Sequence, residues 1–295
     1  MVLCNQLYTS KYESGTPSKR RIIRLIGVNK ATFFYIGKKN KITTKKKNVL
    51  LTIIKRIYDE SDQIYGAPKI LEKIKSQYPY FTKLTTRTVS NYMKELGIRS
   101  IAVPTKYRAQ SKGNGELPFN LPFMNYIKED KPIKPHTHIL TDITYIKTIN
   151  EGWVYKLTFM DLFTRKVLKW DISNKMTGEW VNRIASELIN EYKTIEYIHS
   201  DRGSQYTAFE YVKMLLINGI SPSYSAKGYP YHNAWIESYH AQIKKECIYR
   251  VKILNIKEAK RYCFNYIEGF YNTNRIQKAL GYISPLDYEL RHLKS

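Results

Sequence analysis

The chain has 295 residues, 43% of them hydrophobic, and a net charge of +24. It is therefore long enough for about two domains of ~150 residues and basic enough to indicate nucleic acid or an acidic membrane surface as its partner. No apolar run approaches the ~18 residues of a membrane span, no signal segment opens the chain, and the three cysteines lack the CxxC spacing of a zinc site. We expect a cytoplasmic protein with reduced thiols and no membrane partner, although composition leaves a merely soluble basic protein open.

The positive charge is concentrated towards the N-terminus, where residues 1–112 hold 24 Lys and Arg against 6 Asp and Glu. We interpret residues 1–100 as a basic helical region that binds DNA through two helix-turn-helix-like units. The first unit is predicted within residues 18–38, where a short basic helix ends at Gly27 and Asn29 caps the next helix.

The second helix-turn-helix-like unit follows directly. Apolar residues at helical spacing predict a helix over residues 49–60, and Pro68 suits the first turn of another helix. The next helix is predicted to begin after a cap at Thr85 or Thr86 and to end at Gly97. One face of that helix suits a DNA groove, and a solvated charged face is an equally good interpretation of it. The candidate DNA-binding residues on this face are Arg87, Asn91 and Lys94.

Residues 101–134 are expected to be a linker, because Pro, Lys and Gly are frequent there. The pattern then changes to β-branched runs and helical spacing, which predicts a mixed α/β domain over residues 135–250. A helical extension over residues 251–295 follows, and Asn255 with Glu258 fits a capping box at its first helix. The predicted strands cover residues 138–148, 153–164, 166–173 and 195–201, and the predicted helices cover residues 177–192, 209–220, 233–249 and 255–271.

Three acids of the α/β domain stand in informative contexts. Asp142 lies in the middle of a strand, Asp201 ends a strand, and Glu237 lies one turn into a helix. A carboxylate in an apolar strand is costly to bury unless something compensates its charge, and Mg²⁺ prefers carboxylate and water oxygens as ligands. Two such ions about 3.5–4 Å apart can bind both the attacking and the leaving oxygen of a phosphodiester. The spacing of the three acids alone is a weak signal.

The flanking strings are more specific, and in chain order they read TDITYI, MDLFTR, HSDRGSQY, SYSAKG, NAWIES, IKKE and YNTNRIQKALGYISP. They resemble the catalytic core of the transposases of the insertion sequence three family, which are relatives of retroviral integrases. Upstream, IYGAPKI and MKELGI resemble the helix-turn-helix segment of that family. The resemblance covers roughly residues 20–288, with departures from the family pattern at Ile139, Tyr229 and His232.

The resemblance implies a ribonuclease-H-like catalytic core with a triad of two aspartates and a glutamate. That triad maps onto Asp142, Asp201 and Glu237 as catalytic residues and metal ligands, with two Mg²⁺ ions as cofactors and Mn²⁺ expected to substitute. The implied function is metal-dependent strand cleavage and strand transfer at the ends of an insertion sequence. The implied partners are the terminal repeats, target DNA, further copies of the chain on DNA, and an upstream-frame DNA-binding protein or its fusion. The implied location is the bacterial nucleoid.

Other polar residues near these acids are open to two interpretations. Lys244 follows Glu237 by seven residues, nearly two helical turns, so it shares a helix face with the acid and suits a DNA phosphate; a solvated lysine is the alternative. Arg202 either contacts DNA or braces Asp201. Asp161 is interpreted as a structural residue that makes a hydrogen bond or pairs with Arg165, and an accessory metal ligand is the alternative. His232 and His240 could lie near the site, but two lone histidines do not indicate a zinc site.

Two rival functions remain at this stage. A ribonuclease-H-like nuclease would hydrolyse DNA without strand transfer, but it would not need the basic N-terminal region. An inactive DNA-binding relative would not need the intact set of Asp142, Asp201 and Glu237. Strand-transfer activity separates the first rival from a transposase, and metal-dependent nicking separates the second.

Overall fold

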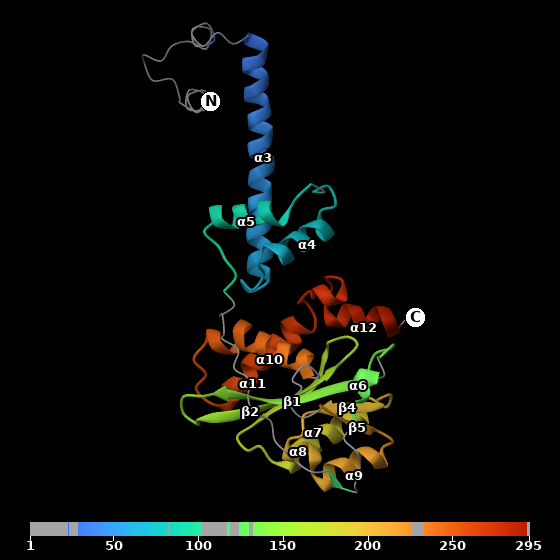
Figure 1. Cartoon of the computed structure of the whole chain (residues 1–295). Helices are drawn as coiled ribbons and strands as arrows, with labels where there is room; N and C mark the ends of the chain where they lie inside the picture. Colours follow the sequence, from blue (N-terminus) through green and yellow to red (C-terminus); the bar gives the residue numbers. More distant parts are fainter. Residues whose placement is uncertain are drawn as a thin grey trace. The chain divides into compact units, whose positions relative to one another are not determined.

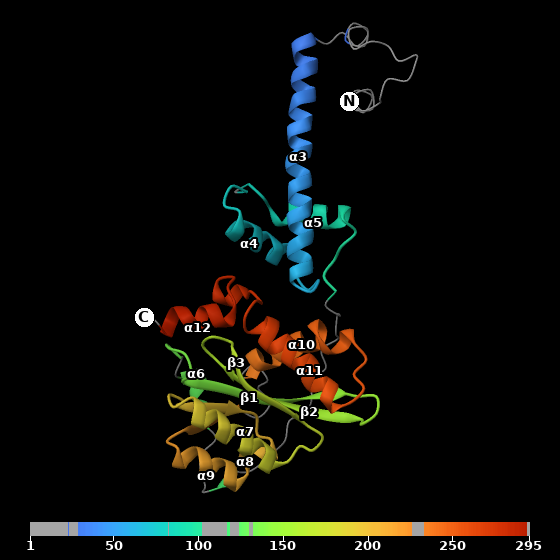
Figure 2. The same cartoon turned by 180° about the vertical axis from the view of Figure 1, so that it is seen from behind.

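The chain divides into a helical unit that ends at Arg99 and a larger α/β unit that begins at Ser100, each of which is considered by itself (Figures 1 and 2). Within the described part of the chain, no helix has both the length and the apolar character needed to cross a membrane. The computed structural model describes residues 23, 29–81, 83–101, 117–118, 124–129, 132–225 and 233–293.

The helical unit contains α3 (Lys30–Glu60), α4 (Ala67–Gln77) and α5 (Thr86–Glu95). The predicted caps are confirmed, because Asn29 Oδ1 accepts a hydrogen bond from the amide of Ala31 at 2.8 Å and Thr85 Oγ1 accepts one from the amide of Thr88 at 3.2 Å. Each cap satisfies an amide that has no partner within its own helix. The three helices bury one apolar stripe each, made of Leu50, Ile53, Ile54, Ile57, Ile70, Leu71, Ile74, Val89 and Met93.

One prediction for this unit is wrong. The sequence suggests that the helix capped by Asn29 and the helix over residues 49–60 belong to separate units, but the structure joins them in the 31 residues of α3. No proline interrupts the intervening residues, and a single glycine costs a helix only about 1 kcal/mol. The basic helix predicted to end at Gly27 lies almost entirely outside the described residues.

The α/β unit is built on a five-stranded mixed sheet in the order β3-β2-β1-β4-β5. Antiparallel pairing joins β1 to β2 and β2 to β3, whereas β4 runs parallel to β1 and β5 parallel to β4. The predicted α/β class is confirmed, but β5 is missing from the prediction because its four residues include a proline and carry no alternating pattern. The strands are β1 (His138–Lys147), β2 (Trp153–Asp161), β3 (Val167–Ser173), β4 (Tyr197–Ser200) and β5 (Ser221–Tyr224).

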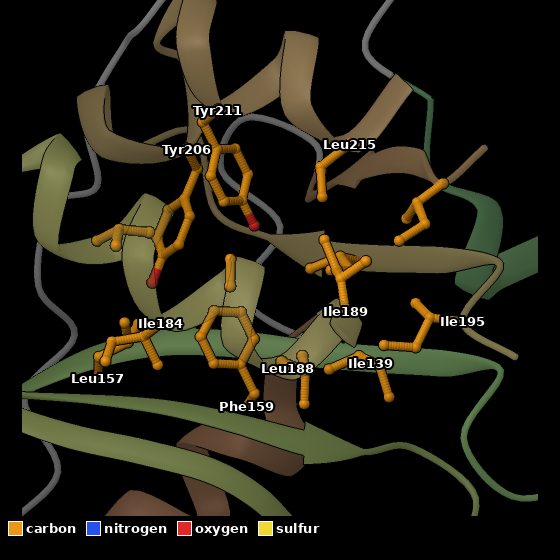
Figure 3. Close-up of a cluster of buried hydrophobic side chains, with 14 of the residues drawn as sticks. Ile139, Leu157, Phe159, Ile184, Leu188, Ile189, Ile195, Tyr206, Tyr211 and Leu215 are labelled. Carbon is orange, nitrogen blue, oxygen red and sulfur yellow. The ribbon is translucent and has the colours of Figure 1, made fainter. Parts of the chain in front are cut away.

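One face of the sheet carries the main hydrophobic core. Figure 3 shows Ile139 of β1 and Phe159 of β2 against Ile184 and Leu188 of α7, with Tyr206 alongside. Strand residues alternate between faces, so the neighbours of these apolar residues point to the opposite side. The helices over this core are α7 (Gly178–Glu191), α8 (Ser204–Thr207) and α9 (Phe209–Ile217).

The opposite face is covered by α10 (Ala234–Glu246) and α11 (Ile256–Tyr266), as both views show (Figures 1 and 2). The predicted cap of α11 is confirmed, since Asn255 Oδ1 accepts a hydrogen bond from the amide of Glu258 at 3.0 Å. The helix predicted to continue to residue 271 instead ends at Tyr266 and widens into a π-helical turn, η4 (Ile267–Tyr271). Short elements complete the unit: α6 (Tyr126–Glu129), η3 (Ile248–Arg250), η5 (Lys278–Leu280) and α12 (Pro285–Leu293).

The last helices pack onto the same α/β unit through polar contacts. Asn272 accepts a hydrogen bond from the amide of Val167 at 3.0 Å and donates one to its carbonyl at 2.9 Å, which copies strand pairing at the start of β3. In α12, the carboxylate of Glu289 binds Lys166 at 2.7 Å and also contacts His136. The segment after residue 250 is therefore anchored to both strands and loops of the sheet.

Candidate active site

Asp142 lies on β1, and Asp201 directly follows β4, the strand that pairs with β1 in parallel. The parallel register sets Leu140 opposite His199, and two further residues along each chain lead to Asp142 and Asp201. Neighbouring strands lie about 4.8 Å apart where they pair, so this register directs the two acids to the same end of the β1–β4 pair. Both of their charges help to raise the pKa of Tyr206, for which burial is the larger cause.

Asp201 is held by the turn that follows β4. Its Oδ1 accepts a hydrogen bond from the amide of Gly203 at 3.0 Å. A Cβ atom at Gly203 would lie 3.0 Å from the same oxygen, closer than side-chain carbons normally approach. The glycine therefore lets the backbone come close enough to fix this carboxylate.

Asp142 points to the face of the sheet that α10 covers. Its Oδ2 lies 3.4 Å from Nδ1 of His240, and 16% of its side chain is exposed. Burial lowers the pKa of Lys244, and the charge of Asp142 acts in the opposite direction, so this ammonium also lies near Asp142. Glu237, His240 and Lys244 follow each other at intervals of three and four residues and therefore share one face of α10. The sequence predicts the shared face of Glu237 and Lys244, but it assigns no role to His240.

The third acid lies on α10, the helix that covers this face of the sheet. Glu237 is half-buried on α10, and among the described residues no three His, Cys, Asp or Glu side chains are arranged to hold a metal ion. The carboxylate oxygens of Asp142 and Asp201 are ligands of the kind that a hard divalent cation prefers, and such an ion would compensate their negative charges. The triad as a complete ligand set therefore stays a prediction.

Asp161 has a structural role. Its buried carboxylate accepts hydrogen bonds from the amide of Thr164 at 2.9 Å, from the hydroxyl of Thr164 at 2.6 Å and from the amide of His136 at 3.1 Å. Burial raises the pKa of Asp161, and these hydrogen bonds oppose the shift. The predicted hydrogen-bonding role is thus confirmed. The guanidinium of Arg165 lies over the ring of Trp235, 4.7 Å from its centroid.

The residues that flank Asp201 fasten β4 to β5. Arg202 Nε donates a hydrogen bond to the carbonyl of Ser225 at 3.1 Å. His199 is buried, and its two ring nitrogens lie 2.8 Å from Ser223 Oγ and 3.0 Å from Ser225 Oγ. These contacts favour the bracing role of Arg202, and its contact with DNA stays a prediction.

The candidate DNA-binding residues of α5 lie where the sequence expects them. Arg87, Asn91 and Lys94 are all exposed, whereas Val89 and Met93 face the core of the helical unit. The face is therefore available to a partner, and its binding to DNA stays a prediction.

The departures from the family pattern fall in two places. Ile139 is completely buried in the main core beneath α7, so an aliphatic side chain fills that position. Tyr229 and His232 lie outside the described residues.

Family models match most of this architecture. Two models described as integrase core domain match residues 132–230 and 218–285, and a model described as HTH-like domain matches residues 45–107. The sheet, the two aspartates and these matches define an integrase-type core that follows a helix-turn-helix-like domain.

Relatives identify the family more closely. The chain is 30% identical over 250 residues to transposase InsF for insertion sequence IS3A of Escherichia coli (strain K12), which covers 82% of each chain. It is 31% identical over 249 residues to the transposase for insertion sequence element IS904 of Lactococcus lactis subsp. lactis (strain IL1403), which covers 83% of this chain and 94% of the relative. The chain belongs to the IS3 family of insertion-sequence transposases.

Solved retroviral structures align with the chain. The HTLV-2 integrase catalytic core domain in complex with magnesium is 12% identical, covers 54% of this chain and 99% of its own, and gives a TM-score of 0.42. The simian T-cell lymphotropic virus intasome, in complex with PP2A regulatory subunit B56 gamma, is 12% identical, covers 79% of this chain and 73% of its own, and gives a TM-score of 0.46.

Proposed function

We propose that this chain is an active transposase that cleaves DNA at the ends of an insertion sequence and joins the freed 3′-hydroxyl to a target strand. The observation that carries the proposal is that Asp142 lies on β1 and Asp201 directly follows β4, its parallel neighbour, within a chain whose relatives are transposases. Partly buried carboxylates need a compensating positive charge. The divalent cations that take part in phosphodiester chemistry would provide that charge.

Asp142, Asp201 and Glu237 are the residues that would hold two Mg²⁺ ions, with Mn²⁺ able to substitute. When bound, such ions lower the pKa of water and neutralise the charge that develops on a phosphodiester. The two aspartates supply oxygens from the sheet, and Glu237 supplies its carboxylate from the facing helix. Lys244 holds a DNA phosphate beside the two aspartates, since its ammonium lies near Asp142.

The helical unit recognises the terminal repeats. Its exposed α5 face provides Arg87, Asn91 and Lys94 for this purpose, and Arg202 contributes to DNA binding at the α/β unit. We further propose that several copies assemble on paired ends and a target, and that an upstream-frame DNA-binding protein acts with this chain or is fused to it. The similarity of the chain to transposases of insertion sequences supports DNA as a partner.

A strand-transfer assay tests the proposal. Oligonucleotides that carry the inverted repeats flanking the gene, with one 3′ end already exposed, are incubated with the full chain, Mg²⁺ and a plasmid target. We expect joined products, and we expect Asp142→Asn, Asp201→Asn and Glu237→Gln to abolish them while DNA binding is retained. Glu187→Gln, an exposed acid of α7, is the matched control and should leave the products unchanged.

The same assay separates the rival functions. Cleavage without joined products would identify a nuclease, and binding without any metal-dependent product would identify an inactive relative. Either result would overturn the proposal.

A further inference from the structure

A lysine is completely buried on the face of the sheet that α10 covers. Lys156 of β2 has no exposed surface, and within the described part of the chain it forms no ion pair. Its Nζ donates hydrogen bonds to Thr158 Oγ1 at 2.6 Å and to the hydroxyl of Tyr239 at 3.2 Å. The same ammonium lies 5.0 Å from the ring centroid of Tyr239 and 5.8 Å from that of Trp170. Burying a cation without a carboxylate is costly, so its position needs an explanation other than packing.

The contacts of Lys156 lead towards the candidate active site. Thr158, its hydrogen-bond partner, lies directly opposite Asp142 in the antiparallel β1–β2 register. The hydroxyl of Thr158 is also 3.3 Å from Nε2 of His240. The other ring nitrogen of His240, Nδ1, is 3.4 Å from Asp142 Oδ2. An unbroken series of polar contacts thus joins the buried ammonium to the carboxylate.

The donors and acceptors of the four side chains indicate which group donates each hydrogen bond in this series. An ammonium can only donate, so Thr158 Oγ1 accepts from Lys156 and its own proton is available for Nε2 of His240. An imidazole that accepts this proton at Nε2 is neutral, and the 3.3 Å contact between Thr158 Oγ1 and Nε2 suits that arrangement. A neutral imidazole that accepts at Nε2 carries its proton on Nδ1. That proton is then donated to Asp142 Oδ2.

We propose that Lys156 and Thr158 are positioning residues that fix the Nδ1–H tautomer of His240 and, through it, the orientation of the Asp142 carboxylate. The importance of this orientation for metal binding rests on the proposed function, whereas the tautomer itself does not. Hydrogen bonds that orient a metal ligand commonly change metal affinity by about 10–100-fold when they are removed.

A purely structural role predicts different behaviour. Replacing a buried charge by a well-packed apolar side chain is often neutral or stabilising, so Lys156→Met would then leave the imidazole and the metal affinity unchanged. A positioning role predicts that both change, whatever happens to stability. Lys156→Met and Thr158→Val break the series at its first and second steps, and Thr158→Ser restores the hydroxyl.

The experiment uses the full chain labelled with ¹⁵N-histidine. Long-range ¹H–¹⁵N correlation spectra of the metal-free protein report which nitrogen of each imidazole carries the proton, and His240→Gln assigns the relevant signal among the six histidines. Titration with MnCl₂ alone, followed by calorimetry, gives the metal affinity. Thr148→Val is the matched control, because Thr148 is a buried threonine that donates to the carbonyl of Gly152 at 2.9 Å and, among the described residues, forms no hydrogen bond with His240.

We expect the Nδ1–H tautomer in the wild type, in Thr158→Ser and in the control. In Thr158→Val and Lys156→Met we expect a mixed or Nε2–H tautomer and Mn²⁺ binding weakened by about 10–100-fold. An unchanged tautomer in Thr158→Val would overturn the inference. If the wild type binds no Mn²⁺ and joins no DNA while the tautomer still responds to Thr158→Val, the proposed function fails and the positioning of Asp142 stands. If strand transfer is normal and the tautomer does not respond to Thr158→Val, the proposed function stands and the positioning role of Lys156 and Thr158 fails.

Discussion

Glu246 and Arg275 form a buried, two-pronged ion pair that ties the end of α10 to the segment after η4. Arg275 Nε lies 2.7 Å from Glu246 Oε2, and Arg275 Nη2 lies 2.6 Å from Oε1. The hydroxyl of Tyr266 adds a hydrogen bond to Oε2 at 2.7 Å. The two charged residues come from the strings IKKE and YNTNRIQ, so the contact fixes the helix that carries Glu237, His240 and Lys244 against the C-terminal part of the chain.

Breaking this pair should destabilise the α/β unit strongly. Arg275→Met leaves Glu246 as a buried charge without its partner, and such a loss typically costs about 3–5 kcal/mol. The free energy of unfolding from urea titrations measures it. The double variant Glu246→Met with Arg275→Met should recover much of the stability, because neither charge is then left alone. Equal losses in the single and double variants would contradict the assignment of this contact.

Gly203→Ala should disturb Asp201 without unfolding the chain. The added Cβ would lie 3.0 Å from Asp201 Oδ1, so the carboxylate has to move away from the amide that now holds it. We expect strand-transfer activity to fall by at least tenfold, whereas the melting temperature changes by only a few degrees. Gly178→Ala is the control, because nothing lies within 4 Å of its added Cβ. Full activity in Gly203→Ala would show that the close approach is unimportant.

The burial of Lys156 predicts a specific dependence of stability on pH. Burial lowers its pKa from 10.5 to about 8 in the folded chain, so above about pH 8 the unfolded chain binds a proton that the folded chain does not. The free energy of unfolding therefore rises with pH, by about 1 kcal/mol between pH 7 and 9 from this residue alone.

Urea titrations of the wild type and of Lys156→Met across this range measure that contribution as a difference. The window stays below the ordinary tyrosine pKa of about 10, at which the unfolded chain begins to lose protons that the buried tyrosines of the folded chain keep. The wild type should gain stability relative to the variant as the pH rises. A difference that is constant, or that falls, would contradict the lowered pKa.

The α5 face should carry part of the electrostatic attraction to DNA. Arg87→Ala and Lys94→Ala should each reduce the slope of log K against log salt by about 0.9 if each contacts one phosphate. Asn91→Ala should leave that slope unchanged but weaken discrimination between terminal-repeat and unrelated DNA. Fluorescence anisotropy at several salt concentrations measures both quantities. Lys75→Ala, an exposed α4 lysine paired with Glu72, is the control, and a larger slope change there would point to another face.

Lys244 and its neighbour Lys245 provide a matched pair on α10. Lys244 lies near Asp142, while Lys245 is rotated about 100° around the helix. Lys244→Ala should weaken end binding and strand transfer together, and Lys244→Arg should be partly tolerated because a positive charge is the main requirement. Lys245→Ala should behave like the wild type. A more damaging effect of Lys245→Ala would place the DNA on a different face of α10.

The sequence by itself determined the features that depend on residues close together in the chain. The caps at Asn29, Thr85 and Asn255 were predictable because a side-chain oxygen bonds to an amide only two or three residues away. The shared face of Glu237 and Lys244 follows from helical periodicity in the same way. The family and the α/β class were also predictable, since the strings around the acids and the alternation of apolar residues are properties of the linear chain.

Only the tertiary structure decided which distant residues meet. The placement of Asp142 and Asp201 at the same end of β1 and β4 depends on the β1–β4 register, which is set by how the helices bury the sheet and not by the 58 residues between the acids in the chain. The series from Lys156 to Asp142 needs two strands and a facing helix, and the Glu246–Arg275 pair needs two distant segments to close around one another. Short-range propensities contain no information on such contacts, because their energies arise only when separate elements exclude water together.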